Sequence, residues 1–299
     1  MMKKINPSTY PESKIKRVPL RINGEQGRII NFTKMTASGN DFVVIEKRNL
    51  AARNKSFNNL ARQACDRKFG IGADGLLLLE KTKKAVVRMR IFNADGSEAE
   101  MCGNGARCAA LYLGSQLSAF SSQLKIETKA GIIEAYILGN NVKIKLTDPT
   151  SIKLNIPLEI NNRLLKVNFI NTGVPHAVIF VNGIEKINVV SLGRQIRYHK
   201  NFSPKGTNVN FVEILNNNSI LTRTYERGVE DETLACGTGS AASALLTVYS
   251  LGLTTKKSVN VHTRSGEVLK VYFDRINNHF CNVWLEGKAR IVYKGEYHV

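Results

Sequence analysis

Two short segments, Met-Cys-Gly-Asn-Gly-Ala at residues 101–106 and Ala-Cys-Gly-Thr-Gly-Ser at 235–240, share the pattern Cys-Gly-x-Gly. Cys236 follows Cys102 by 134 residues, and shifting the chain by this distance aligns further residues in the same order. The aligned pairs are Gly39 with Gly173, Gly72 with Gly206, Asp74 with Asn208 and Glu98 with Glu232. A common order of matches over nearly a hundred residues predicts that the chain is an internal duplication.

Each half predicts the same order of elements. A strand with a glycine loop comes first, and a helix follows, which in the first half covers 57–68 with Ser56 as N-cap and Gly70 near its end. A strand and a polar turn then lead into the Cys-Gly-x-Gly loop, which opens an apolar helix at 104–113 and again at 238–251. The predicted fold class is α/β (α+β), with two pseudo-symmetric domains. Each domain is a curved β-sheet or barrel-like shell around a central helix, and the active site lies in the interdomain cleft.

The predicted domain boundaries follow from the repeat. Residues 31–147, together with about 283–299, form the N-terminal domain, and residues 148–282 form the C-terminal domain. Residues 1–30 form a basic N-terminal extension with seven Lys or Arg and two Glu. This extension lacks the apolar region of a secretory signal, so we expect a cytoplasmic protein, with organelle targeting as the alternative.

The composition of the chain indicates which kinds of partner to expect. The chain has 299 residues, of which 43% are hydrophobic and 22% charged, as in a soluble globular protein. Its longest aliphatic run, 76–79, is too short to cross a bilayer. The net charge of +19 would suit a nucleic acid or a membrane surface, but the basic residues are spread along the chain and form no recognised binding motif. We therefore predict a solvated basic surface and neither a nucleic-acid nor a membrane partner.

The five cysteines form an odd number and include no Cys-x-x-Cys pair, which argues against a disulfide framework and a zinc site. We predict no metal. Cys65, Cys108 and Cys281 are interpreted as structural, because a lone cysteine is most often a small buried hydrophobe. Cys102 and Cys236 differ from them, because each falls just before the first turn of a predicted helix.

A helix N-terminus offers unpaired N–H groups and a partial positive charge. We therefore expect the pKa of both thiols to fall from about 8.5 towards neutrality. The loop glycines would let backbone amides approach an anion closely. These amides belong to Gly103, Asn104, Gly237 and Thr238. The alternative interpretation is two tight turns before helices, with incidental cysteines.

Pseudo-twofold symmetry would place the two loops face to face. A carboxylate held by both helix ends would place its α-carbon between two sulfurs. One thiolate could remove the α-proton while the opposite thiol delivers another, which inverts the carbon. The sequence thus predicts an amino-acid epimerase that uses no organic cofactor.

Four segments carry a further resemblance. They are MTASGNDF at 35–42, FNADGSEAEMCGNGAR at 92–107, NTGVPH at 171–176 and YERGVEDETLACGTG at 225–239. In this order they resemble the diaminopimelate epimerase family, and the likeness runs from about residue 31 to the C-terminus.

The resemblance implies interconversion of LL- and meso-diaminopimelate, which feeds lysine and cell-wall synthesis, and a homodimer. It implies that Cys102 and Cys236 are the acid/base pair and that His176 and Glu226 flank them and set their ionisation. The residues implied to hold the distal end of the substrate are Asn40, Asn93, Asn208, Glu226 and Arg227. The amides of Gly103, Asn104, Gly237 and Thr238 match those that hold the reacting carboxylate.

The sequence departs from the family at two positions that would face the distal end. Val174 replaces an asparagine and Gly75 replaces a glutamine of many relatives, and each change removes a polar side chain. A racemase of another amino acid, such as proline or histidine, on the same fold is therefore an alternative. A thiol redox enzyme with a peroxidatic and a resolving cysteine is another.

Overall fold

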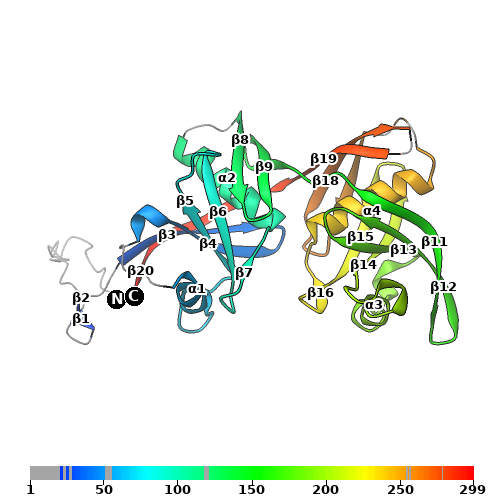
Figure 1. Ribbon diagram of the computed structural model, residues 1–299, viewed down its shortest axis with the longest axis horizontal. Helices are drawn as coiled ribbons and strands as arrows, with labels where there is room; N and C mark the ends of the chain where they lie inside the picture. The colour runs from blue at the N-terminus through cyan, green and yellow to red at the C-terminus, as the bar shows by residue number, and fades with distance from the viewer. Residues whose placement is uncertain are drawn as a thin grey trace, which may run out of the picture.

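The computed structural model describes residues 21–22, 25–26, 29–50, 56–117, 121–253, 255, 257–277 and 279–299. It forms two domains side by side, each a curved sheet around one long helix (Figure 1). Most of the predicted extension, 1–30, lies outside the described residues. Within it, β1 (Arg21–Ile22) and β2 (Glu25–Gln26) pair with each other.

The elements of the two halves follow the same order. The first half contains β3 (Ile29–Ala37), β4 (Asn40–Glu46), α1 (Phe57–Cys65), β5 (Gly75–Glu80), β6 (Val87–Asn93), β7 (Glu98–Ala99), α2 (Gly103–Leu117), β8 (Ser121–Thr128), β9 (Gly131–Leu138) and β10 (Asn141–Lys145). The second contains β11 (Thr150–Ile160), β12 (Arg163–Asn171), β13 (Pro175–Phe180), α3 (Val189–Arg197), β14 (Asn208–Asn216), β15 (Ser219–Glu226), β16 (Asp231–Thr233), α4 (Gly237–Ser250), β17 (Ser258–His262), β18 (Val268–Ile276), β19 (His279–Lys288) and β20 (Arg290–His298). Short 3₁₀ turns are η2 (Lys47–Asn49), η3 (Ile184–Lys186) and η4 (Lys200–Phe202).

Strand pairing repeats in the same way. The first domain runs β20-β3-β4-β5-β6-β8-β9-β10, and the second runs β11-β12-β13-β14-β15-β17-β18-β19. The β10–β19 pairing joins the two sheets. Over the described residues β20 pairs only with β3 and β11 only with β12, so the sheet is curved but not closed. The predicted fold class, two pseudo-symmetric α+β domains, is confirmed.

β20 crosses between the domains. β11 is the first strand of the second domain and pairs with β12, whereas β20 follows β19 of the second domain and pairs with β3 of the first. The pairing of β20 accords with assigning the C-terminal strand to the first domain. The exact boundaries, at 147 and about 283, stay a prediction, because β19 is bonded to strands of both domains.

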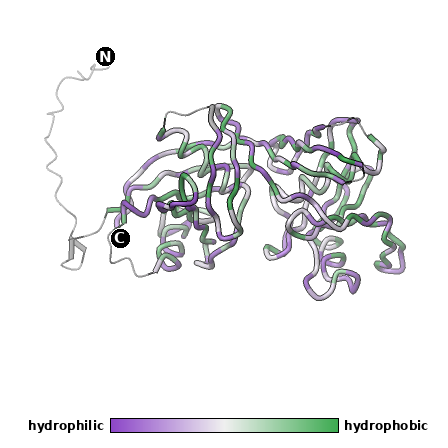
Figure 2. The backbone as a smooth tube through the Cα atoms, turned by 45° about the horizontal axis from the view of Figure 1, so that its top comes forward, coloured by the Kyte–Doolittle hydropathy of each residue, from purple (hydrophilic) through white to green (hydrophobic). Residues whose placement is uncertain are grey.

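Burial explains why the strands alternate imperfectly. β9 shows every second residue buried, because one face meets α2 and the other meets solvent, whereas β5 is buried on both faces between α2 and α1. Figure 2 shows hydrophobic and hydrophilic residues alternating along the outer strands. A single apolar cluster surrounds α2 and α4 and runs through both domains, while α1 and α3 each cover an outer face with a separate cluster. In the described part of the chain no helix is long and apolar enough to span a membrane.

Local chemistry sets the limits of α1. The predicted cap is confirmed, since the Ser56 hydroxyl accepts a hydrogen bond from the Asn59 amide at 3.3 Å. The helix ends at Cys65 rather than at residue 68. The reason is Asp66, whose carboxylate accepts hydrogen bonds from the amides of Lys68 and Phe69 and turns the chain.

One alignment of the repeat is wrong by one residue. Phe42 pairs with Gly75 between β4 and β5, and His176 pairs with Asn208 between β13 and β14. The structural counterpart of Asn208 is therefore Gly75 and not Asp74. The loops before these strands differ in length by one residue, which a rigid shift of the sequence cannot follow.

Candidate active site

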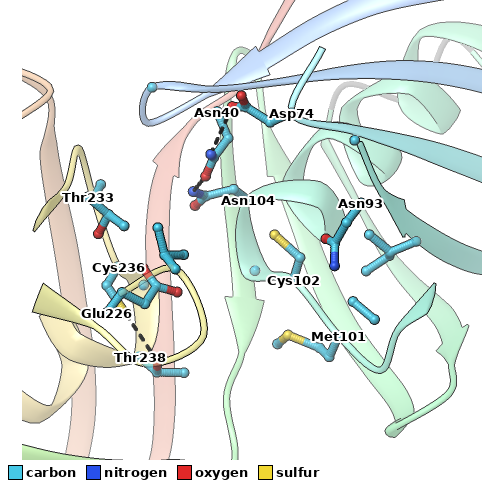
Figure 3. A pocket seen from close by; sticks show the side chains of 18 of the residues that line it. Asn40, Asp74, Asn93, Met101, Cys102, Asn104, Glu226, Thr233, Cys236 and Thr238 are labelled. Carbon is cyan, nitrogen blue, oxygen red and sulfur yellow. Dashed lines mark hydrogen bonds between the residues drawn. The ribbon is translucent and has the colours of Figure 1, made fainter. Parts of the chain in front are cut away.

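A cleft lies between the domains, and the N-termini of α2 and α4 both open into it (Figure 3). Its volume of about 1370 Å³ exceeds the roughly 300–1000 Å³ of most small-ligand pockets, so a substrate with polar groups at both ends has room. Among the predicted site residues, those that line it are Asn40, Asn93, Cys102, Gly103, Asn104, Asn208, Glu226, Arg227, Cys236, Gly237 and Thr238. Val174 and Gly75 line it as well. His176 does not.

The two cysteines occupy equivalent positions at the helix starts. α2 begins at Gly103 and α4 at Gly237, each directly after a cysteine. The Sγ of Cys102 accepts a hydrogen bond from the Gly105 amide at 3.4 Å, and the Sγ of Cys236 accepts one from Gly239 at the same distance. Each sulfur therefore caps its helix, as a serine or aspartate oxygen would. The two cysteines come from opposite domains and line the same cleft (Figure 3).

The net effect of the surroundings is to raise the pKa of both thiols and not to lower it. Burial raises the pKa of Cys102, and it raises the pKa of Cys236 to about 12, with a further upward contribution from the negative charge of Glu226 on both. Hydrogen bonds from the helix amides lower both values but do not outweigh burial. The prediction that the helix N-terminus alone brings these thiols near neutrality is therefore wrong. Forming a thiolate here requires additional positive charge in the cleft.

Arg107 is a buried positive charge near Cys102, and its effect on the pKa of Cys102 is already part of this balance; its role was not predicted from the sequence. This side chain of α2 is fully buried. Its guanidinium donates to the Ser38 hydroxyl at 2.9 Å and to the Asn104 side-chain oxygen, and its charge lowers the pKa of Cys102. At the same place in α4 the chain has Ala241. The sequence did contain a sign of this role, because an arginine within an otherwise apolar helix is rarely buried unless it has a polar or charged partner.

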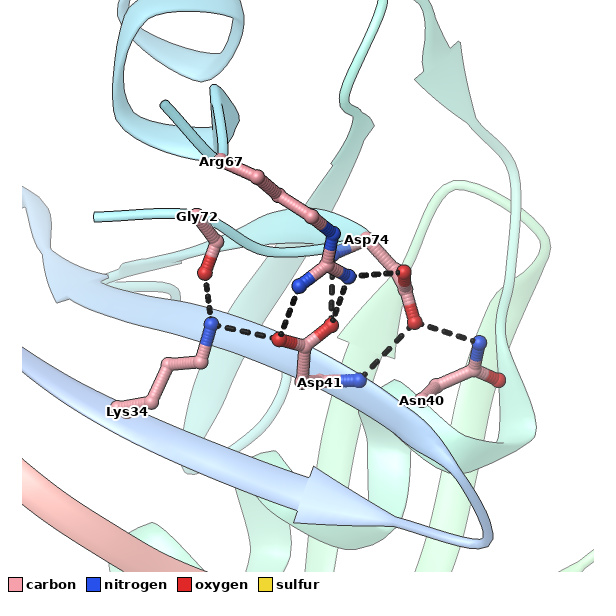
Figure 4. Close-up of polar contacts among 6 residues, drawn as sticks. All are labelled: Lys34, Asn40, Asp41, Arg67, Gly72 and Asp74. Carbon is pink, nitrogen blue, oxygen red and sulfur yellow. Dashed lines mark hydrogen bonds and ion pairs between the residues drawn. The ribbon is translucent and has the colours of Figure 1, made fainter. Parts of the chain in front are cut away.

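A charged network fixes the wall of the cleft beside α2 (Figure 4). Arg67 bridges Asp41 and Asp74 at 2.8 and 2.7 Å, and Lys34 pairs with Asp41 at 2.7 Å. Burial alone would raise the pKa of Asp41, but hydrogen bonds from Arg67 and Lys34 hold it far below its usual range. Asp41 thus stays ionised and keeps both cations in place.

The network orients Asn40. Its amide nitrogen donates to Asp74 at 3.0 Å, and its oxygen accepts a hydrogen bond from the Asn104 side chain at 2.6 Å. Both ends of the Asn40 amide are therefore defined by protein partners. Asn104 is the second residue of α2, so the same contacts hold the helix start in position.

The other predicted polar residues also have protein partners. Asn208 donates to the Pro175 carbonyl at 3.1 Å and accepts a hydrogen bond from the Arg227 amide at 2.8 Å. Asn93 donates to the Ser97 hydroxyl at 2.9 Å. Burial raises the pKa of Glu226, which ends β15 next to Arg227. Asn208 thus anchors the backbone that presents Glu226 and Arg227 to the cleft.

His176 lies beneath the cleft on β13 and is fully buried. Burial lowers the pKa of its imidazole to about 3, with a smaller contribution from the positive charge of Arg227. The ring is therefore neutral at physiological pH. Its Nδ1 lies 3.0 Å from the side-chain nitrogen of Asn210, another residue that the sequence analysis missed.

Solved structures with this architecture show which fold the chain adopts. A hydroxyproline epimerase from Agrobacterium vitis, with bound trans-4-hydroxy-L-proline, superimposes with a TM-score of 0.67 at 14% identity over 91% of each chain. A PhzF-family phenazine biosynthesis protein from Bacillus anthracis gives 0.67 at 18% identity, over 90% of this chain and 98% of its own. At these identities the likeness shows the fold alone, which is the two-domain fold of epimerases and related proteins.

The sequence comparisons identify the family. The sequence model described as diaminopimelate epimerase matches residues 32–152 and 168–292, one match in each half. The diaminopimelate epimerase of Aquifex aeolicus is 44% identical over 276 residues, which cover 89% of this chain and 97% of its own. That of Methanocella arvoryzae is 43% identical over 278 residues, covering 89% and 96%. The chain belongs to the diaminopimelate epimerase family and is an isomerase.

Proposed function

We propose that this protein interconverts LL- and meso-diaminopimelate by moving the α-proton between Cys102 and Cys236, without an organic cofactor. The observation that carries the proposal is the pair of cysteines that cap two symmetry-related helices at one cleft. A carbon held between two such sulfurs can lose a proton on one side and gain one on the other.

The helix starts are the site for the reacting carboxylate. The amides of Gly103 and Asn104 begin α2, and those of Gly237 and Thr238 begin α4. Amides in the first turn of a helix lack an intrahelical acceptor and suit an anion. The same donors stabilise the charge that develops when the α-proton leaves, which is where preorganised electrostatics contribute most to the rate.

Ionisation of a thiol in this cleft requires compensation for burial. Three positive sources converge on the sulfurs: the helix N-termini, Arg107 beside Cys102, and the ammonium group of the bound substrate. Glu226 acts in the opposite sense, because its negative charge raises the pKa of both cysteines. We therefore assign to Glu226 the role of keeping one sulfur protonated while the other is a thiolate.

The distal end of the substrate carries a second ammonium and carboxylate. Arg227 offers a planar donor pair to a carboxylate, and Glu226 together with the asparagines of the cleft offers acceptors to an ammonium. Asn40 and Asn93 belong to this set, and Asn208 acts through the backbone of Arg227. Val174 and Gly75 leave this end with fewer polar side chains, so Arg227 carries more of the recognition.

We also propose a homodimer, which the family resemblance implies, and a cytoplasmic location. Sedimentation velocity of the full chain tests the first statement, because a dimer has twice the chain mass of 33.2 kDa. The role of the protein in lysine and cell-wall precursor synthesis follows from the proposed substrate.

The decisive assay uses LL-diaminopimelate and purified protein in deuterated water, with no pyridoxal phosphate or metal added. We expect meso-diaminopimelate to form and one deuterium to enter the inverted carbon. Proline and histidine in parallel reactions test the alternative racemases, and activity on them but not on diaminopimelate would overturn the proposal. All five cysteines are free in the structure. A turnover that requires a Cys102–Cys236 disulfide would instead support the thiol redox alternative.

A further inference from the structure

Asn210 makes a set of contacts that fixes its side-chain orientation. It is fully buried on β14. Its side-chain nitrogen lies 3.0 Å from His176 Nδ1 and 3.2 Å from the Ala177 carbonyl oxygen, and its oxygen accepts a hydrogen bond from the Thr224 hydroxyl at 3.0 Å. Turning the amide over would place its oxygen against the Ala177 carbonyl, two acceptors in contact. The nitrogen therefore faces both Ala177 and His176.

This orientation decides where the imidazole carries its proton. An amide nitrogen only donates, so His176 Nδ1 must accept, and a neutral ring that accepts at Nδ1 carries its hydrogen on Nε2. A second proton is disfavoured by burial and by Arg227, the nearby cation that acts on the ring. The Nε2–H is buried and has no hydrogen-bond partner among the described residues. A donor left unpaired in this way is costly in a folded protein and typical of a functional site.

Asn210 also contacts the helix that carries Cys236. Its oxygen lies 2.3 Å from the point where a Cβ on Gly239 would sit, and the Gly239 amide donates to the Cys236 sulfur. One side chain thus connects the imidazole to the start of α4. In the first domain the counterpart beneath Gly105 is Leu77, at 3.1 Å, and the counterpart of His176 is Phe42. Asn210 and His176 thus form a polar pair in the second domain. The equivalent residues of the first domain, Leu77 and Phe42, are apolar.

We propose that Asn210 is a positioning residue that holds His176 as the neutral Nε2–H tautomer, a hydrogen-bond donor and not a proton acceptor, beside the Cys236 helix. Its consequence for epimerisation rests on the proposed function, whereas the tautomer itself does not. His176 then serves the site as a fixed dipole, and the two cysteines alone exchange the substrate proton.

The test is ¹⁵N NMR of the full chain labelled at histidine, with the His176 signals assigned by their loss in His176→Phe. In the wild type we expect an unprotonated Nδ1 and a protonated Nε2, unchanged between pH 8 and pH 5. Asn210→Asp replaces the donor with an acceptor, so we expect Nδ1 to become protonated. Asn210→Leu follows the first domain, where leucine fits the same place, and we expect a mixture of tautomers.

Asn168→Leu is the matched control. Asn168 is a buried asparagine of β12 whose hydrogen bonds within the described part of the chain go to backbone atoms of Asn155 and Val178. We expect this variant to lose stability but to keep the His176 signals and the wild-type kcat/KM, whereas Asn210→Asp lowers kcat/KM at least tenfold.

A wild-type His176 protonated at Nδ1, or a signal that Asn210→Asp leaves unchanged, would overturn the tautomer assignment. An altered tautomer with unchanged kcat/KM would overturn its role in the reaction. The wild-type spectrum tests the tautomer of His176 even if a variant does not fold. This test is independent of whether diaminopimelate is the substrate.

Discussion

At the scale of single residues, a symmetric pair of cysteines has asymmetric surroundings. Cys102 lies near the buried cation Arg107, whereas Cys236 contacts the Thr238 hydroxyl at 3.5 Å and has alanine in place of that arginine. The proposed mechanism needs one thiolate and one thiol at a time. A difference in local charge favours one assignment over the other without preventing their exchange during turnover.

Arg227 gives the first prediction. Replacing it with Ala should lower kcat/KM for diaminopimelate by about 100-fold or more, because a two-pronged donor to a carboxylate is worth roughly 3 kcal/mol. Arg227→Lys should recover only part, since an ammonium cannot form the same fork. Steady-state kinetics on both variants provide the measurement. Near-normal kcat/KM in Arg227→Ala would show that the distal carboxylate binds elsewhere.

His176 gives a prediction about stability and pH. Its pKa is about 3 in the folded protein against 6.5 ordinarily, so the unfolded chain binds more protons between these values. The free energy of unfolding contributed by this group is therefore complete above pH 6.5 and declines by about 2 kcal/mol between pH 7 and pH 5. His176→Phe should remove that decline. Urea unfolding of both proteins at the two pH values measures the difference, and equal slopes would contradict the neutral, buried assignment.

Site residues within the family motifs could be predicted from the sequence. The roles of Arg107 and Asn210, which act on motif residues, could not. The site residues predicted from the sequence all line the cleft except His176. Arg107 and Asn210 were missed because their role depends on which atoms surround them. The charge network of Asp41 and Arg67 joins residues 26 positions apart, which no local pattern links.

At the scale of elements, the starts of α2 and α4 define the site. The second glycine of each Cys-Gly-x-Gly loop lets the helix approach the strand beneath it, and the neighbours differ. A Cβ on Gly105 would lie 3.1 Å from a Leu77 methyl, which can move, whereas one on Gly239 would lie 2.3 Å from the Asn210 oxygen. That oxygen is held by the Thr224 hydroxyl.

We therefore expect Gly239→Ala to be much more damaging than Gly105→Ala. The first should cost about 2–4 kcal/mol of unfolding free energy and most of the activity, because a buried hydrogen-bonded amide must move. The second should cost about 1 kcal/mol, since only a side chain adjusts. Urea unfolding and kcat/KM of both variants provide the comparison. Equal losses would mean that the two helix starts are packed alike.

The order of the elements was predictable, but their limits and registers were less so. The helices after both cysteines and the Ser56 cap follow from local propensity and chemistry. The end of α1 and the pairing of Gly75 with Phe42 depend on a side-chain turn and on loop length. Neither the end of α1 nor this strand register can be read from an alignment of the two halves.

At the level of the whole molecule, β20 ties the two domains together. β20 covers the edge of β3 in the first domain although it follows the last strand of the second. Deleting residues 290–299 should therefore expose the β3 edge and yield an insoluble or unfolded chain. Deleting residues 1–28, before the family match at residue 32, should leave solubility and activity intact. Circular dichroism and the epimerase assay on both truncations test the proposed boundaries, and a folded chain without 290–299 would refute them.

The sequence predicted that the C-terminal strand belongs to the first domain, but not that β3 is the strand with which β20 pairs. The repeat predicted two similar domains, but a strand that pairs with the other domain has the same pattern as one that pairs with its own. Only the long-range registers distinguish the two arrangements.

If the two sulfurs act from opposite faces of the substrate carbon, replacing each cysteine singly separates the two proton transfers. Cys102→Ser and Cys236→Ser should each abolish epimerisation, because a hydroxyl is far too weak an acid to replace a thiol. Each variant keeps one sulfur, which can still remove a proton from the stereoisomer that faces it. A diaminopimelate analogue that eliminates a β-leaving group after that step reports this half-reaction.

We predict that each variant eliminates from one stereoisomer of the analogue and not from the other, with opposite preferences in Cys102→Ser and Cys236→Ser. The same preference in both variants would place both sulfurs on one face of the carbon and exclude the two-sided mechanism. Normal epimerisation by either variant would show that its missing cysteine is structural.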